Sequence, residues 1–241
     1  MATALLVSAL DENRILRALP EQDRRDLASK FEPYVLEHEI LVKPGGTIAM
    51  AYFPSEGLIS VVAALKDGRR AEVATVGCEG MTGLPLVLGS GTSLYEIVSQ
   101  VAGHGLRIRA AWLIDEVERR PAFKTRLLRY AEARMAMLGQ TAACNAAHRI
   151  TERLARWLLI SHDSVSGDTF VLTHEFLSHM LAAERPSVTV AAGTLQKSGA
   201  IAYRRGQVRI KDRAQLERAA CECYQIVRRE VDRLVDGNGT V

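Results

Sequence analysis

The stretch formed by residues 110–147 contains a single proline, Pro121, and a single glycine, Gly139. It is rich in Ala, Leu, Arg and Met, residues with high helix propensity, and it therefore predicts a long helix. The segments on either side have a different composition and a different pattern of apolar residues. The helix is thus expected to separate an N-terminal unit from a C-terminal one.

The N-terminal unit begins with a short charged segment, residues 11–30, whose apolar residues recur at helical spacing. Between residues 32 and 108, short apolar segments alternate with Gly and Pro, and the pair Asp67-Gly68 marks a turn. Apolar runs of this length, separated by turn residues, are typical of an antiparallel roll or barrel. The predicted fold class is α+β: an N-terminal antiparallel β-roll of jelly-roll type, the long helix, and a C-terminal helical unit.

One face of the long helix has a coiled-coil-like pattern. Its members follow each other at intervals of 3, 4, 3, 4 and 3 residues: Leu128, Ala131, Met135, Leu138, Ala142 and Asn145. Such a seam is typical of helices that pair, and a polar Asn145 on it could fix the register. A helix packed on its own domain produces a similar periodicity, so both interpretations stay open.

The C-terminal unit contains two short predicted helices with a tight turn between them. Thr173 is a good N-cap for the first helix, which covers residues 174–181, and Pro186 suits the first turn of the second, which ends near Ser198. Two alternating segments follow, residues 200–203 and 207–210, and they predict a hairpin. This arrangement is a helix-turn-helix followed by a wing.

Positive charge is concentrated in this unit. The whole chain has a net charge of only +3, with 31 Lys and Arg against 28 Asp and Glu. Residues 185–213 alone carry seven basic side chains and one acidic side chain, a balance of +6, so the remainder nets −3. A basic hairpin directly after a two-helix unit favours binding to duplex DNA over a merely solvated basic face.

Taken together, these features resemble the Crp/Fnr family of bacterial transcription regulators. The resemblance rests on the segments 172–177 (LTHEFL) and 185–189 (RPSVT), and on 153–159 (RLARWLL), which is similar to the helix that enters the family's DNA-binding domain. It implies a β-roll sensor domain of the cyclic-nucleotide-binding type at residues 1–115, a dimerisation helix at 116–147 and a winged helix-turn-helix domain at 148–241. It also implies a homodimer on a pseudo-palindromic operator, with RNA polymerase as a further partner.

By this resemblance the second helix enters the major groove and the wing contacts the DNA backbone. The expected DNA-binding residues are Thr173, Arg185, Ser187, Val188, Thr189, Val190, Lys197, Arg204 and Arg205. The chain has Pro186 and Val190 where the family's commonest recognition helix carries a Glu and a second Arg. We therefore expect an operator that differs from the usual one.

Cyclic AMP is not the expected effector. Family members that bind it use a Gly-Glu pair and an Arg, because a buried phosphate needs a charge-assisted partner. Here Thr82 stands about where the Glu belongs, and no Arg lies between Arg70 and Arg107. The sensor domain is expected to bind another effector or none.

Other functions find little support. The histidines of the segment 174–179 (HEFLSH) are five residues apart, which places them on different helical faces, and no P-loop, nucleophile elbow or dinucleotide motif is present. We expect no enzymatic activity, no cofactor and no metal site; Cys221 and Cys223 are expected to lack neighbouring ligands.

The four scattered cysteines and the absence of an apolar run long enough for a membrane span indicate a cytoplasmic protein without a membrane partner. The remaining alternative is a β-roll regulatory or protein-interaction module with no specific DNA target.

Overall fold

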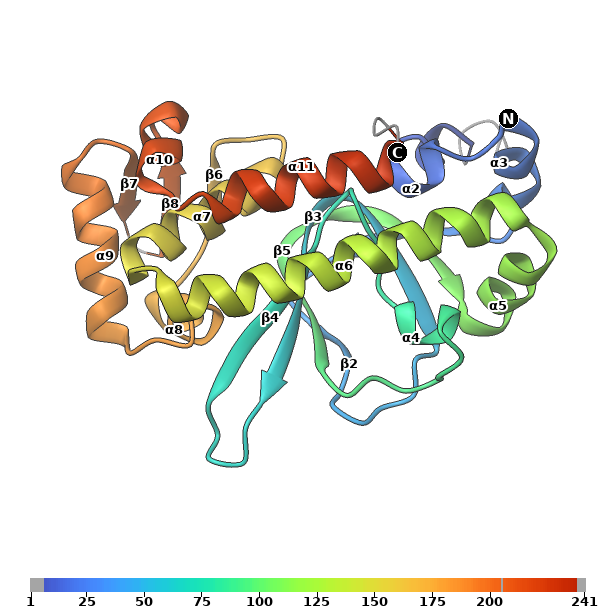
Figure 1. Cartoon of the computed structure of the whole chain (residues 1–241), viewed down its shortest axis with the longest axis horizontal. Coiled ribbons are helices and arrows are strands. Elements are labelled where there is room, and N and C mark those ends of the chain that lie inside the picture. The colour runs from blue at the N-terminus through green and yellow to red at the C-terminus, as the bar shows by residue number, and fades with distance from the viewer. Residues whose placement is uncertain (1–6, 205, 238–241) are drawn as a thin grey trace.

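The computed structural model describes residues 7–204 and 206–237, and Figure 1 shows its elements. In chain order they are α2 (Arg14–Arg17), α3 (Glu21–Ala28), β1 (Glu32–Leu36), β2 (Ile40–Val42), β3 (Met50–Ala64), β4 (Arg70–Val76), α4 (Leu84–Val87), β5 (Glu96–Arg109), α5 (Ala110–Arg119), α6 (Pro121–Ala147), α7 (Ile150–Asp163), β6 (Thr169–Val171), α8 (His174–Met180), α9 (Arg185–Lys197), β7 (Ile201–Arg204), β8 (Gln207–Ile210), α10 (Arg213–Ala219) and α11 (Cys223–Val235). The β-roll lies at one end of the molecule and the winged unit at the other, with α6 running between them (Figure 1).

The N-terminal unit is an antiparallel sheet with the strand order β1-β5-β3-β4, and β2 also pairs with β5. Its two longest strands, β3 and β5, pair along most of their length. The predicted turn at Asp67-Gly68 joins β3 to β4, and Gly68 has a φ of +85°, a conformation that favours glycine. The α+β fold class predicted from the sequence is confirmed.

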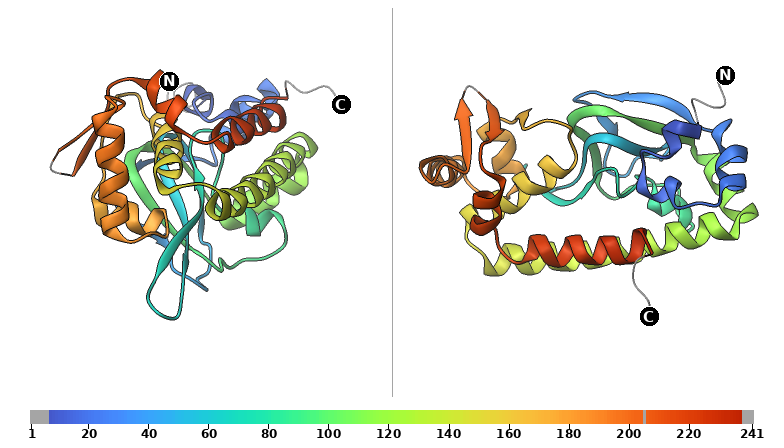
Figure 2. Two further views of the ribbon diagram at one scale, coloured as in Figure 1. Left: turned by 60° about the vertical axis from the view of Figure 1, so that its left-hand side comes forward. Right: turned by 90° about the horizontal axis from the view of Figure 1, so that it is seen from above.

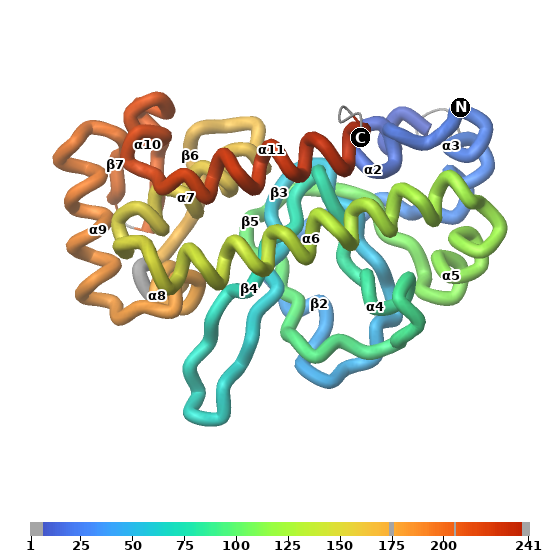
Figure 3. The backbone as a smooth tube through the Cα atoms, in the orientation of Figure 1, coloured from blue at the N-terminus to red at the C-terminus, as the bar shows by residue number. Residues whose placement is uncertain are grey.

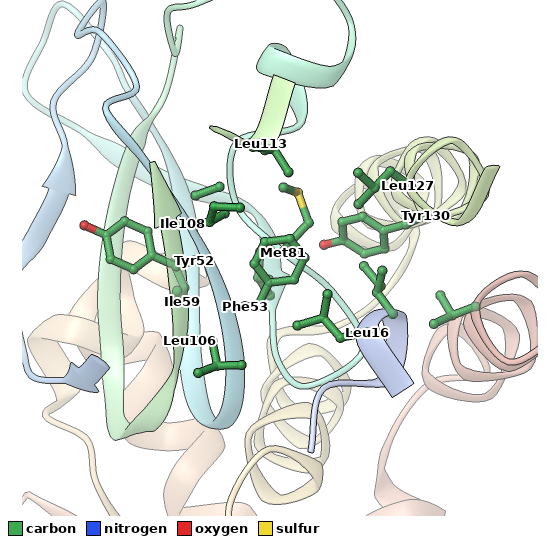
Figure 4. Close-up of a cluster of buried hydrophobic side chains, with 14 of the residues drawn as sticks. Leu16, Tyr52, Phe53, Ile59, Met81, Leu106, Ile108, Leu113, Leu127 and Tyr130 are labelled. Atoms are coloured by element: carbon green, nitrogen blue, oxygen red, sulfur yellow. The ribbon is translucent and has the colours of Figure 1, made fainter. Parts of the chain in front are cut away.

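The long helix α6 packs on the roll through the aromatic side chain of Tyr130. Figure 4 shows Tyr130 of α6 pointing toward Met81 and Phe53, and all three are almost completely buried. A Cβ atom at Gly80 would collide with the Tyr130 ring, so this position has to be a glycine. The core of the roll therefore includes the face of α6 that packs on it.

The helix predicted over residues 110–147 is in fact two helices. It breaks between α5 and α6 at Arg120, which has φ −121° and ψ 95°. Pro121 causes the break, because a proline disfavours helical conformation in the residue before it and lacks the N–H that a continuing helix needs. Pro20 likewise separates α2 from α3 in the segment 11–30, where the spacing predicted one helical stretch.

The winged unit packs directly on the roll through α7. The Trp157 indole Nε1 donates a hydrogen bond to Glu72 Oε1 on β4 at 2.8 Å, and Ser60 Oγ donates to Glu72 Oε2 at 2.5 Å. Burial raises the pKa of Glu72 to about 7, although these hydrogen bonds and the nearby Arg156 and Arg134 counteract the effect. Glu72 is thus a buried acid at the contact between the two units.

The C-terminal helix returns along the long helix. Figures 1 and 3 show α11 beside α6, and the view from above in Figure 2 agrees. Tyr224, near the start of α11, packs with the winged unit, whereas Val227 and Val231 pack with the core of the roll. This path brings Cys221 and Cys223 against Cys144, so the expectation that the first two lack neighbouring ligands is wrong.

Among the described residues, no helix is long and apolar enough to cross a membrane.

Candidate nucleic-acid interface

Helices α8 and α9 form the predicted helix-turn-helix. Thr173 caps α8, since its Oγ1 accepts a hydrogen bond from the Phe176 amide at 3.1 Å. The turn contains Ala182 with a φ of +45°, and the Ala183 amide donates to the Ser178 carbonyl at 3.0 Å. Pro186 stands in the first turn of α9, as expected from its missing N–H.

The outer face of α9 is open to solvent. Arg185 and Thr189 are exposed, and the Val190 side chain is 70% exposed, although Val190 is apolar. Ser187 is half-buried at the edge of this face. An exposed helix face that carries a guanidinium, a hydroxyl and a branched aliphatic group has the chemistry needed to contact base edges and thymine methyl groups.

One expected contact residue faces the other way. Val188 is completely buried and belongs to the core of the winged unit. It packs against the inner side of the helix pair, so its side chain is not accessible to DNA. The expectation for Val188 is therefore corrected: it positions α9 and does not contact a ligand.

The wing lies beside α9 and is hydrogen-bonded both to α9 and to the residue that precedes the N-cap of α8. Strand β8 pairs with β7 and β6, and the Tyr203 hydroxyl donates to the Leu172 carbonyl at 2.8 Å. The Tyr203 amide donates to Gln196 Oε1 of α9 at 2.8 Å. Arg204 is exposed at the end of β7, whereas Arg205 lies outside the described residues. Figure 2 shows this hairpin and α9 together at the end of the molecule away from the roll.

The basic residues of the segment 185–213 do not all serve this surface. Lys197 is exposed at the end of α9, and Arg209 is exposed on β8. Arg213, by contrast, forms ion pairs with Asp163 at 2.7 Å and Glu217 at 3.0 Å. These ion pairs hold α10 against α7. The positive charge that remains for a polyanion comes from α9 and the wing.

The predicted seam of α6 lies mostly on an exposed face. Met135 is 66% exposed, Leu128 43% and Leu138 36%, and Ala142 and Asn145 are also exposed. Ala131 is the exception, because it is buried against the roll. Large apolar side chains in a row on a helix that already has two packed neighbours form an unusual surface for a monomer.

A cavity of about 340 Å³ lies between the roll and α6. Its lining is mainly aliphatic, and Thr82 is among its few polar residues, with its Oγ1 accepting a hydrogen bond from the Tyr52 amide at 3.0 Å. The cavity also contains Arg134, which sequence reasoning missed because it comes from the helix and not from the roll. The Arg134 guanidinium already donates to the Thr75 carbonyl.

Comparison with known proteins agrees with this architecture. Residues 152–219 match the model of the Crp-like helix-turn-helix domain. No curated protein sequence matches the chain. The fold is similar to FixK2 from Bradyrhizobium japonicum, at 16% identity and a TM-score of 0.65, covering 79% of this chain and 98% of that one.

Two further solved structures show the same likeness. A transcriptional regulator of the CRP family from Thermus thermophilus has 22% identity and a TM-score of 0.62 over 78% of this chain and 96% of its own. The c-di-GMP-responsive global regulator CLP from Xanthomonas campestris has 15% identity and a TM-score of 0.59 over 80% and 100%. The resemblance predicted from the sequence is confirmed: residues 152–219 are a Crp-like helix-turn-helix domain, and the chain as a whole has the fold of the Crp/Fnr family regulators.

Proposed function

We propose that this chain is a homodimeric, sequence-specific DNA-binding transcription regulator, and not an enzyme. The observation that carries the proposal is the exposed outer face of α9 with the basic wing beside it, where Arg185, Val190 and Arg204 are all exposed. In this arrangement α9 enters the major groove of duplex DNA, and Lys197 and Arg204 meet phosphates. The relatives of known structure include transcriptional regulators of the same fold, which supports the proposal.

The exposed seam of α6 supports the dimer. Pairing two copies through Leu128, Met135 and Leu138 removes three apolar side chains of each copy from water. The two α9 helices of such a dimer then read half-sites about 34 Å apart. By resemblance, RNA polymerase is the further partner, and the free thiols support a cytoplasmic location.

We also propose that the sensor domain does not bind cyclic AMP. A cyclic nucleotide needs a cation for its phosphate and an acceptor for its ribose. The cavity between roll and α6 offers Arg134 as a cation, but this guanidinium is already bonded to the Thr75 carbonyl. The carboxylate of Glu79 accepts a hydrogen bond from the Gly77 amide at 3.0 Å and does not line the cavity. The lining instead favours a small, largely apolar effector.

The test is DNA binding by Arg185→Ala, measured by fluorescence anisotropy on an operator selected from genomic fragments. We expect a loss of about 1 to 3 kcal/mol on the operator and a relaxed preference at one base pair. Arg17→Ala is the matched control, because Arg17 is an exposed arginine on α2, at the opposite end of the molecule (Figure 1).

Three outcomes would overturn parts of this proposal. Equal weakening on operator and random DNA would make Arg185 a phosphate contact. Absent or salt-insensitive binding by the unmodified protein would favour an interaction module without a DNA target. Micromolar affinity for cyclic AMP in a calorimetric titration would refute the effector assignment.

A further inference from the structure

Four side chains with metal-ligating atoms converge where α6 ends and α11 begins. Cys144 Sγ lies 3.5 Å from Cys221 Sγ, and Cys223 Sγ lies 3.5 Å from His148 Nδ1. All four ligand atoms lie within 4.8 Å of one another. Cys144 and Cys223 are completely buried and Cys221 is nearly so. The cluster is thus an enclosed set of three sulfurs and one nitrogen.

The two separations of 3.5 Å are close to those around a single tetrahedral zinc ion. Zinc–sulfur bonds of about 2.3 Å and zinc–nitrogen bonds of about 2.0 Å place two sulfurs about 3.8 Å apart and a sulfur about 3.5 Å from a nitrogen. An iron–sulfur cluster needs its cysteines spread around several iron atoms, which a group this compact does not allow. A Cys₃His set with no open position is typical of structural zinc sites.

The outer partners orient the ligands. His148 Nε2 lies 3.3 Å from Glu222 Oε1, so the carboxylate can hold the proton on Nε2 and leave the Nδ1 lone pair directed at the cluster. Gln140, one turn before Cys144 on α6, donates from Nε2 to Cys223 Sγ at 3.0 Å. A carboxylate–histidine pair and an amide donor to sulfur are the supporting contacts expected around a bound zinc.

The local charge also fits. Arg153 of α7 interacts electrostatically with Cys144 and Cys221, and Arg156 interacts with Cys144. The Nε atoms of both arginines are buried without a hydrogen-bond partner among the described residues. Three thiolates, a neutral imidazole and Zn²⁺ together carry a net charge of −1. Two neighbouring guanidinium groups offset that charge.

We propose that the chain binds one structural zinc ion at the junction of α6 and α11, through the ligands Cys144, His148, Cys221 and Cys223. On binding, each cysteine releases its thiol proton to solvent, and the ion forms four bonds to the protein. The ion joins the end of the long helix to the connection between α10 and α11. This site is independent of the DNA surface, which lies on α9 and the wing.

The first experiment uses the full-length protein, reduced, stripped of metal by a chelator, and titrated anaerobically with Co²⁺ and then Zn²⁺. We expect one equivalent of Co²⁺ to produce the intense d–d bands of a tetrahedral site together with a thiolate-to-cobalt charge-transfer band, and Zn²⁺ to displace it. Zinc should also raise the melting temperature of the stripped protein. This measurement needs no variant and so does not depend on whether a variant folds.

Variants then test the ligand set. Cys223→Ser should lose the stoichiometric binding, whereas Cys78→Ser, the matched control on the one cysteine outside the cluster, should retain it. Glu222→Gln should bind zinc about 10- to 100-fold more weakly, because it removes only the partner of His148.

The proposal is overturned if the reduced protein takes up no Co²⁺, if Cys78→Ser lowers binding as much as Cys223→Ser does, or if the protein as purified anaerobically carries a brown iron–sulfur chromophore. A Cys144–Cys221 disulfide that is found in protein prepared under reducing conditions would overturn it too. None of these results depends on whether the protein binds DNA.

Discussion

The buried Glu72 makes the stability of this protein depend on pH. Burial raises the pKa of this carboxyl from an ordinary value of 4.5 to about 7 in the folded chain. Below pH 4.5 both the folded and the unfolded chain keep the proton, and Glu72 has no effect. As pH rises from 4.5 to 7, the unfolded chain ionises first, so the free energy of unfolding falls and then levels off above pH 7.

The size of the effect follows from the two pKa values. The full difference between 4.5 and about 7 corresponds to about 3 kcal/mol. Between pH 5 and pH 8, where the measurement is practical, this carboxyl lowers the free energy of unfolding by about 2.5 kcal/mol. That is a substantial part of the total stability of an ordinary domain.

The perturbation that isolates this effect is Glu72→Gln. The glutamine has no charge to bury and keeps a carbonyl oxygen that can accept the Trp157 indole hydrogen bond. We expect the variant to lack the decline between pH 5 and pH 8, and to exceed the unmodified protein in stability at pH 8 by about 3 kcal/mol. Urea unfolding at several pH values, followed by tryptophan fluorescence, measures this directly.

Glu118→Gln is the control, since Glu118 is exposed on α5. Its stability should follow that of the unmodified protein at every pH. If the curves for Glu72→Gln and the unmodified protein run parallel from pH 5 to pH 8, then Glu72 is ionised in the folded chain. In that case the nearby arginines outweigh burial, and the reasoning is refuted.

Three further predictions concern other parts of the molecule. Met135→Glu should leave the fold intact, because Met135 is 66% exposed. Sedimentation velocity should show that it converts a dimer into a monomer. If the dimer persists, the interface does not lie on this seam. Gly103→Ala should destabilise the protein by about 3 kcal/mol in urea unfolding, because a Cβ atom there would collide with the backbone of Glu56. An unchanged urea midpoint would contradict that packing. Cys78 should react with iodoacetamide more slowly than a small thiol at neutral pH, since burial raises its pKa to about 11; equal rates would indicate an accessible thiolate and a redox role.

The elements with local signals could be predicted from the sequence. Thr173, Pro186 and the alternating hairpin each fix a boundary within a few residues, so the helix-turn-helix and its wing were predicted correctly. The break at Pro121 has a local signal as well, but helix propensity on both sides outweighed it in the prediction.

The remaining features depend on contacts between distant parts of the chain. Arg134 reaches the sensor cavity only because Tyr130 locks α6 against the roll. Cys221 contacts Cys144 only because α11 returns along α6, and no periodicity in the sequence predicts that path. The burial of Val188, by contrast, follows a local pattern, because Val188 shares one face of α9 with the buried Ala191, Ala192 and Leu195.

The return of α11 also determines how the winged unit can move. The chain leaves α6 at its last turn, builds the whole unit, and comes back to the same point at Cys221, 3.5 Å from Cys144 between the two sulfurs. Entry and exit therefore lie at one point. Between them, α7 and the loop after it are held to the roll by the Trp157–Glu72 hydrogen bond, by the Gly57 amide, which donates to the Ser164 carbonyl at 2.7 Å, and by apolar packing. Because both ends of the unit are fixed together, its orientation on the roll, and with it the direction of α9, depends on these α7 contacts.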